Sequence, residues 1–332
     1  MFFIRFFSLI CFFSVCCGFS AFADSLWGNP DSERPRAVLK GSWGENPELL
    51  REKRENTFDL AGLFFKEESE GENIPLPPWL ENAVAIPDVA EESPMIAIVI
   101  DDLGINRKMT QEVLELPGPL TASFLYYADD LPDQTRQAEA AGHELLVHTP
   151  MEPINAGFDP GPGALKTQMS AQEITDRLDL MLEAFSGYVG INNHMGSRFT
   201  ANEQVMRPVM EEVKKRGLLF LDSLTSSRSV AGRIADEQNI PYAVRNVFLD
   251  NAQDEREIMK QLALLERHAR KHRFAVGIGH PHKETVQALK RWIPQAKQKG
   301  FVFVPISMIA VYLQDEKNAE NIRALNQHDE GE

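Results

Sequence analysis

The sequence predicts an α/β fold in which seven or eight parallel strands, each followed by a helix, form a distorted barrel. Short apolar runs alternate with amphipathic helical patterns between residues 94 and 313, as expected for a parallel sheet covered by helices. Four runs, at 96–102, 144–148, 189–194 and 274–280, are typical of strands buried within a sheet. Each of the four ends in Asp or His, and in a parallel barrel all strand ends meet on one rim.

The first 23 residues have the pattern of a secretory signal peptide. A single basic residue, Arg5, precedes an apolar run over 6–22, and a small-x-small triplet ends at Ala23. This run is shorter than the roughly 20 residues that span a bilayer, which favours cleavage after Ala23 over a retained inner-membrane anchor. All three cysteines lie within the segment, so we expect a periplasmic protein without disulfides.

Residues 24–93 are expected to be an acidic, proline-containing linker that is largely disordered. They are polar and have few periodic apolar runs, so they have little surface to bury. The tail at 314–332 is also polar, which leaves one folded domain at 94–313. The linker could contact an envelope protein partner.

The charge of the chain argues against nucleic acid as a partner. The formal net charge is −15 at pH 7. An acidic surface repels phosphate backbones, and the sequence has no dense basic stripe that would reverse this effect.

Expected strands and helices follow one another at regular intervals within the domain. The strands are expected at 95–101, 120–126, 144–148, 189–193, 218–222, 243–249, 274–278 and 301–305. The clearest helix begins with a capping box formed by Ser170 and Glu173, after which apolar residues recur at helical spacing from Ile174 to Phe185. Further helices are expected around 205–213, 258–265 and 286–293, where apolar residues share one face.

Acidic and imidazole side chains at the strand ends form the candidate site. They are Asp101, Asp102, His148, His194, Asp222, Asp250 and His280, and a barrel would gather them on one rim. Any one of them alone could cap a helix or bind a loop. A core strand has no packing reason to end in such groups, because burying them without partners is costly. Their joint occurrence on six strands therefore predicts a functional site.

Four short blocks resemble the motifs of a known family. They are Asp101-Asp102-Leu103-Gly104, His148-Thr149-Pro150-Met151-Glu152, Ile191-Asn192-Asn193-His194-Met195-Gly196-Ser197 and Gly277-Ile278-Gly279-His280-Pro281-His282. In this order they resemble the divergent polysaccharide deacetylases, a branch of the NodB-homology class found in exported bacterial proteins. The resemblance covers residues 94–312 and implies a NodB-like distorted barrel.

The resemblance also implies a site for a divalent metal ion. Asp101 would be the general base, and Asp102 and His148 would be ligands. Where the family pattern has a second histidine, this chain has Glu152. Either Glu152 is the third ligand, or His194 supplies it from the next strand while Glu152 is held in a turn between two prolines. We favour His194, because an imidazole preserves the ligand set, and N and O donors of this kind suit zinc.

The remaining candidates would act on proton transfer or on the substrate. His280 matches the family's late histidine and would be the general acid. Asp222 or Asp250 would hold its imidazole in the required tautomer. Arg198 could bind a carboxylate or sugar hydroxyls, or be only an exposed charge. His282 could support the site or face solvent from its loop.

The resemblance implies an exported metal-dependent hydrolase that removes acetyl groups from an envelope carbohydrate, such as peptidoglycan or another N-acetylated glycan. The alternative is a non-catalytic carbohydrate-binding or scaffold protein that retains the fold. The chain lacks the Arg-x-Pro-Tyr motif of typical deacetylases, which points to a different or smaller substrate. A metal-free glycosidase is disfavoured, because adjacent Asp101 and Asp102 should point in different directions, whereas glycosidases need two facing carboxyl groups about 5–9 Å apart.

Overall fold

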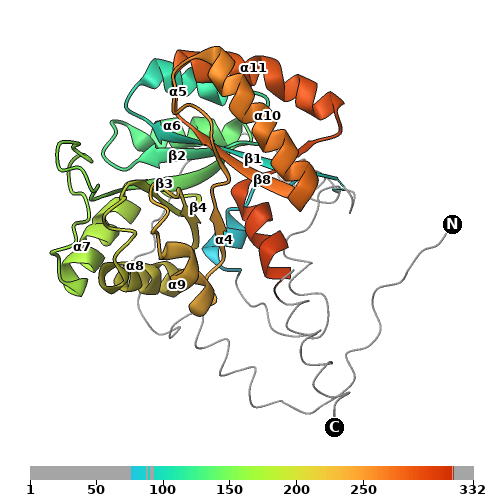
Figure 1. The fold of residues 1–332 in the computed structure, drawn as a ribbon. Helices are drawn as coiled ribbons and strands as arrows, with labels where there is room; N and C mark the ends of the chain where they lie inside the picture. Colours follow the sequence, from blue (N-terminus) through green and yellow to red (C-terminus); the bar gives the residue numbers. More distant parts are fainter. Residues whose placement is uncertain (1–75, 87–88, 90–92, 316, 318–332) are drawn as a thin grey trace, which may run out of the picture. The chain divides into compact units, whose positions relative to one another are not determined.

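The computed structural model describes residues 76–86, 89, 93–315 and 317 (Figure 1). The expected signal peptide, most of the expected linker and nearly all of the polar tail lie outside these residues. No helix in the described ranges is both long and apolar enough to cross a membrane.

A single all-parallel sheet forms the centre of the domain, which confirms the predicted α/β fold. Its strands are β1 (Met95–Leu103), β2 (Thr121–Leu125), β3 (Glu144–Met151), β4 (Tyr188–Met195), β5 (Leu219–Asp222), β6 (Tyr242–Val244), β7 (Val247–Phe248), β8 (Phe274–Gly279) and β9 (Val302–Phe303). The strand order is β6-β5-β4-β3-β2-β1-β8-β7, and β9 pairs with the start of β1. Because the strands are parallel, their carboxyl ends lie at one edge of the sheet, which is curled into a half-barrel.

The distortion of the barrel is located between β6 and β7. The sequence predicts one strand over 243–249, but the structure divides it, because its first half pairs with β5 and its second half with β8. Between the halves, Asn246 exchanges hydrogen bonds with the backbone of Val276: its own N–H donates to the carbonyl at 2.9 Å, and its Oδ1 accepts from the amide at 2.7 Å. Within the described chain β6 and β7 do not pair with each other, so the ring of strands stays open there.

Helices follow the strands and cover the outer face of the sheet (Figure 1). They are α5 (Arg107–Leu114), α6 (Leu131–Ala140), α7 (Ala171–Leu182), α8 (Glu203–Lys215), α9 (Ala231–Glu237), α10 (Glu255–His272) and α11 (Lys283–Gln298). The predicted capping box at the start of α7 is confirmed: the amide of Ser170 donates to Glu173 Oε2 at 2.8 Å, and the amide of Glu173 donates to Ser170 Oγ at 3.3 Å. These reciprocal bonds satisfy two amides that the first turn would otherwise leave unpaired.

Alternation along the strands divides the core into two apolar clusters. On β1, Ile96, Ile98 and Ile100 pack beneath the outer helices, whereas Ala97 and Val99 face the other side, which we call the inner face. Because side chains alternate along a strand, Asp101 falls on the inner face as well.

The inner face is covered by segments near both ends of the described chain. Helical residues 306–315 supply part of the cover, and the short helix α4 (Pro78–Glu81) supplies Trp79 and Leu80. Trp79 is 3% exposed, and its amide donates to the carbonyl of Gly217 at 3.1 Å. Residues 76–86 fall within the expected linker, and their apolar side chains pack in or against the inner cluster.

A buried carboxyl group lies at the opposite end of the strands from the candidate site. Glu144, the first residue of β3, accepts hydrogen bonds from the amide and hydroxyl of Ser307 in the first turn of the 306–315 helix. Burial raises the pKa of Glu144 to about 7, against the opposing effect of these hydrogen bonds.

Candidate metal site and proton-transfer groups

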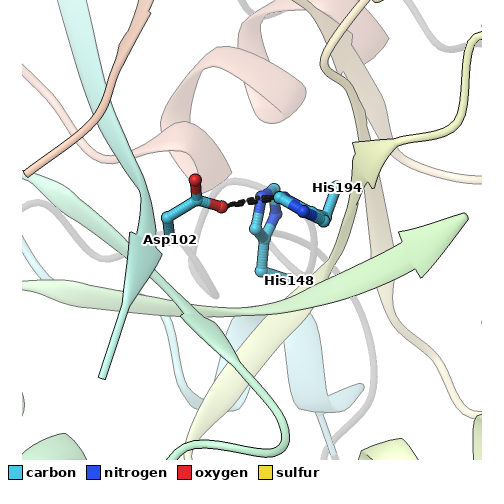
Figure 2. Close-up of side chains that lie close together, drawn as sticks. All are labelled: Asp102, His148 and His194. Carbon is cyan, nitrogen blue, oxygen red and sulfur yellow. Dashed lines mark hydrogen bonds and ion pairs between the residues drawn. The ribbon is translucent and has the colours of Figure 1, made fainter. Parts of the chain in front are cut away.

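Three side chains from three strands converge at the carboxyl edge of the sheet (Figure 2). Asp102 Oδ1 lies 2.8 Å from His194 Nδ1 and 3.2 Å from His148 Nε2, and the two imidazole nitrogens are 3.2 Å apart. The residues come from β1, β3 and β4. One oxygen and two nitrogens thus form a compact triangle.

The dimensions of the triangle fit a zinc ion. Tetrahedral zinc with bonds of about 2.0–2.1 Å separates its ligand atoms by about 3.3 Å, close to the three distances between these atoms. Asp102 Oδ1 is buried and lacks an aligned hydrogen-bond donor in the described part of the chain, although both imidazoles are near it. A buried carboxylate oxygen in that situation is costly unless a cation binds it. The donor set therefore fits a metal ion.

An unusual backbone conformation lets two adjacent carboxylates approach the same histidine. Asp102 has φ of 59°, and the pairing of β1 with β2 shifts register between Ile100 and Leu103. Regular alternation would turn Asp102 away from the inner face, but the left-handed conformation turns it back. As a result Asp101 Oδ2 and Asp102 Oδ1 lie 3.7 Å and 3.2 Å from His148 Nε2.

The electrostatics of the cluster favour an ionised carboxylate beside its histidines. Burial alone would raise the pKa of Asp102, but the close approach of His148 and His194 outweighs burial and holds that pKa well below its usual range. For His148, burial opposes protonation, while Asp101 and Asp102 raise its pKa above the ordinary value. A divalent cation would replace the proton as the partner of these carboxylates.

Asn192 is a buried member of the site that the sequence interpretation missed. Its Nδ2 donates to Asp101 Oδ1 at 2.8 Å, and its Oδ1 lies 2.8 Å from His148 Nδ1. The signal was present in the sequence, because Asn192 precedes His194 by two residues and therefore shares its strand face. A polar residue two positions before a candidate ligand in a buried strand is therefore also a candidate for the site.

His280 is held by Asp250 and not by Asp222, the other acidic residue considered from the sequence. His280 Nδ1 lies 3.0 Å from Asp250 Oδ1, and the His280 amide donates to Asp250 Oδ2 at 2.6 Å. Thr285 Oγ1 donates to the same oxygen at 2.7 Å. Burial lowers the pKa of His280, but Asp250, with Asp101 and Asp102, outweighs this and raises the pKa to about 9. The other imidazole nitrogen, Nε2, lies 4.0 Å from Asp102 Oδ2.

Asp222 supports a neighbouring loop. Its carboxylate accepts hydrogen bonds from the amide of Leu224 at 2.8 Å and from Ser229 Oγ at 2.7 Å. Phe220 precedes it by two residues and packs in the outer cluster, so Asp222 also lies on the outer side of β5. Burial raises the pKa of Asp222, with these hydrogen bonds opposing the rise.

Glu152 and Arg198 stabilise a loop next to the site. Glu152 Oε2 accepts hydrogen bonds from both the amide and the hydroxyl of Thr167 at 2.7 Å. Arg198 donates to the carbonyl of Ile154 at 3.0 Å and lies 3.4 Å from Glu152 Oε1. Both Glu152 oxygens are thus engaged outside the Asp102–His148–His194 triangle, which favours His194 as the third ligand.

His282 belongs to a second group of metal-binding side chain types. Ligand atoms of Asp250, His280 and His282 lie within 4.8 Å of one another. His282 is half-buried at the N-cap of α11, and its Nε2 lies 3.1 Å from Gln253 Nε2. Because Asp250 already accepts three hydrogen bonds from His280 and Thr285, this group has less free ligand capacity than the triangle around Asp102.

A comparison with models of known protein families shows which family the chain resembles. The family model for divergent polysaccharide deacetylases matches residues 98–310. The chain belongs to this family. The match includes all three residues of the triangle, and it confirms the resemblance inferred from the four sequence blocks.

Proteins of three bacteria are similar to this chain over more than half of its length. An uncharacterized protein of Haemophilus influenzae is 34% identical over 195 residues, which cover 59% of this chain and 69% of that protein. The uncharacterized protein YibQ of Escherichia coli K12 is 34% identical over 199 residues, covering 60% of this chain and 62% of YibQ. The crystal structure of an uncharacterized protein from Agrobacterium tumefaciens C58 superposes with a TM-score of 0.69 at 32% identity, covering 72% of this chain and 97% of that one.

Proposed function

We propose that this protein is an exported zinc-dependent hydrolase that removes N-acetyl groups from an envelope carbohydrate. The observation that carries the proposal is the triangle of Asp102, His148 and His194, whose donor atoms lie 2.8–3.2 Å apart with Asp101 and His280 beside it. Membership of the polysaccharide deacetylase family supports an acetylated glycan as substrate. The signal peptide pattern at 1–23 supports a periplasmic location.

The three donor side chains would hold the metal ion. When bound, zinc supplies a Lewis acid that polarises the acetyl carbonyl and lowers the pKa of a water molecule toward neutrality. His148 and His194 contribute neutral nitrogen donors, and Asp102 contributes a carboxylate that offsets part of the positive charge. Three protein ligands leave a coordination position for the reaction.

Asp101 and His280 would move the protons. Asp101 accepts a proton from the attacking water as its oxygen bonds to the acetyl carbon. The C–N bond then breaks, acetate leaves, and His280 donates a proton to the departing amine. A pKa of about 9 keeps His280 protonated at neutral pH, as a general acid requires. Asp250 orients the ring so that Nε2, which lies 4.0 Å from Asp102, faces the site.

Acetate release tests this proposal. Zinc-loaded protein would be incubated with chitooligosaccharides and N-acetylated peptidoglycan fragments, and wild type would be compared with Asp101→Asn. We expect the variant to retain zinc and to lose activity by about 100-fold or more, because the general base is absent. Asp129→Asn, which changes an exposed carboxylate in the loop after β2, is the matched control.

The non-catalytic alternative gives the opposite result. The lack of an Arg-x-Pro-Tyr motif is the observation that favours it, since typical deacetylases use that motif in the substrate groove. If wild type and Asp101→Asn bind zinc equally and neither releases acetate, the protein is not a deacetylase of these glycans. Binding of the same glycans without turnover would then support a carbohydrate-binding role.

A further inference from the structure

We propose that Asn192 is a positioning residue that aligns the base Asp101 with the metal ligand His148 through a single amide group. The part that concerns Asp101 rests on the proposed function, whereas the part that concerns His148 requires only that the site binds zinc. Asn192 lies on β4, is fully buried, and shares the inner face with His194.

Both ends of the Asn192 amide are fully used. Oδ1 accepts a hydrogen bond from Ser123 Oγ at 2.6 Å and lies 2.8 Å from His148 Nδ1. Nδ2 donates to Asp101 Oδ1 at 2.8 Å and to Ser223 Oγ at 3.1 Å. A primary amide offers two acceptor and two donor positions, so no polar group of Asn192 is left without a partner.

The hydrogen bonds of Asn192 show which way its amide lies. The NH₂ group faces Asp101 and donates to it, so the carbonyl oxygen, which only accepts hydrogen bonds, faces His148. His148 Nδ1 must then carry the hydrogen. Its Nε2 keeps the lone pair, and this is the atom directed at Asp102 and His194. Asn192 thus selects the tautomer that a metal ion needs.

Substitutions of similar size can separate the two contacts. Asn192→Asp keeps an acceptor for His148 Nδ1–H but loses the donors to Asp101 and Ser223. Asn192→Leu keeps the approximate shape and loses both functions. Asn193 is the matched control residue: it neighbours Asn192 on the same strand, is also buried, and binds the carbonyl of Met195 and the amide of Ser223.

Zinc affinity and steady-state kinetics of Asn192→Asp form the first test. We expect zinc affinity to be equal or tighter, because a carboxylate is a good partner for a ligating histidine. We expect kcat for acetate release from chitooligosaccharides to fall by about 10- to 100-fold with little change in KM, because Asp101 loses its donor and gains a like charge. A loss of zinc affinity, or an unchanged kcat in an active enzyme, would overturn the proposal.

The second test measures the tautomer of His148, and it does not require the protein to be an active enzyme. In zinc-free protein at alkaline pH, where the imidazole is neutral, ¹⁵N chemical shifts should report a hydrogen on Nδ1. We expect Asn192→Leu to lose this preference and to bind zinc about 10- to 100-fold more weakly. Asn193→Ser should retain both the tautomer and the zinc affinity.

The two tests distinguish this proposal from the proposed function. If no glycan is deacetylated but Asn192→Leu changes the tautomer and zinc affinity, the deacetylase function fails and the role of Asn192 at His148 stands. If the enzyme is active but the tautomer is unaffected in Asn192→Leu, the role of Asn192 is wrong. Should Asn192→Leu fail to fold, the zinc affinity of the isosteric variant Asn192→Asp replaces this test. A loss of affinity in Asn192→Asp would then overturn the role of Asn192 at His148.

Discussion

Asp102 Oδ1 lies 2.8 Å from His194 Nδ1, although two strands of the sheet separate β1 from β4. In a flat sheet, with strands about 4.8 Å apart, three strand spacings would hold the two backbones about 14 Å apart. The curl of the sheet shortens this separation, and both side chains point toward the inner face. The candidate metal site is therefore a property of the curved sheet and not of any one strand.

Removal of one imidazole should remove the ion and leave the fold intact. We expect His148→Ala to lose the single tightly bound zinc, because two donors remain, and to keep the helical circular dichroism of wild type, because the rim adds little to the apolar core. Metal content by elemental analysis and far-ultraviolet spectra would be measured together. His272→Ala, an exposed residue at the end of α10, should retain the zinc. Loss of the fold together with the metal would mean that the ion is structural.

The left-handed conformation at Asp102 predicts a difference between two small replacements. Asp102→Gly and Asp102→Ala should both lose zinc, but glycine adopts a φ of 59° without strain. Zinc-free Asp102→Gly should therefore be more stable than Asp102→Ala by about 1 kcal/mol. Urea unfolding of both variants measures this difference. An alanine variant of equal or greater stability would contradict the backbone conformation assigned to this residue.

Glu144 predicts how stability depends on pH. Its folded pKa of about 7 lies above the ordinary value of 4.5, so the folded state binds more protons than the unfolded state between these values. The contribution of Glu144 to stability is complete below about pH 4.5 and is lost as pH rises through about 7.

The matched variant is Glu144→Gln, which keeps an acceptor for Ser307 and does not titrate. The unfolding free energies of wild type and variant would be compared across this window by urea denaturation. We expect wild type to lose stability relative to the variant as the pH increases. Parallel curves would show that Glu144 does not titrate in this range.

The pairing of Asp250 with His280 predicts a kinetic effect on the proposed reaction. Asp250→Asn should lower kcat by about 100-fold with little change in KM, because His280 loses the partner that orients it and holds its proton. Thr285→Val removes only one hydrogen bond to Asp250 and should cause a smaller fall. Steady-state acetate release measures both. Equal effects of the two substitutions would show that the Asp250–His280 contact has no specific role.

The packing of α4 predicts that the folded domain extends beyond the part of the chain expected from sequence. Trp79→Ala should destabilise the protein by about 3–5 kcal/mol, because it empties a large buried site in the inner cluster. Phe158→Ala, at an exposed loop residue, should have a much smaller effect. Thermal and urea unfolding provide the measurement. A neutral Trp79→Ala substitution would mean that α4 is not part of the stable core.

Local patterns of residues predicted the strands, the helices and the capping box at Ser170, because these features depend on residues close together in the chain. The sequence also named Asp102, His148 and His194 as candidates, because the ends of parallel strands must lie at one edge. The folded protein was needed to show that Asp250 contacts His280, that Asp222 lies on the outer side of β5, and that Asn192 contacts both β1 and β3. Those outcomes depend on the curl of the sheet, the register shift in β1 and the division of the 243–249 segment. Such features arise from pairing between segments that are distant in the chain, and local patterns of residues do not predict that pairing.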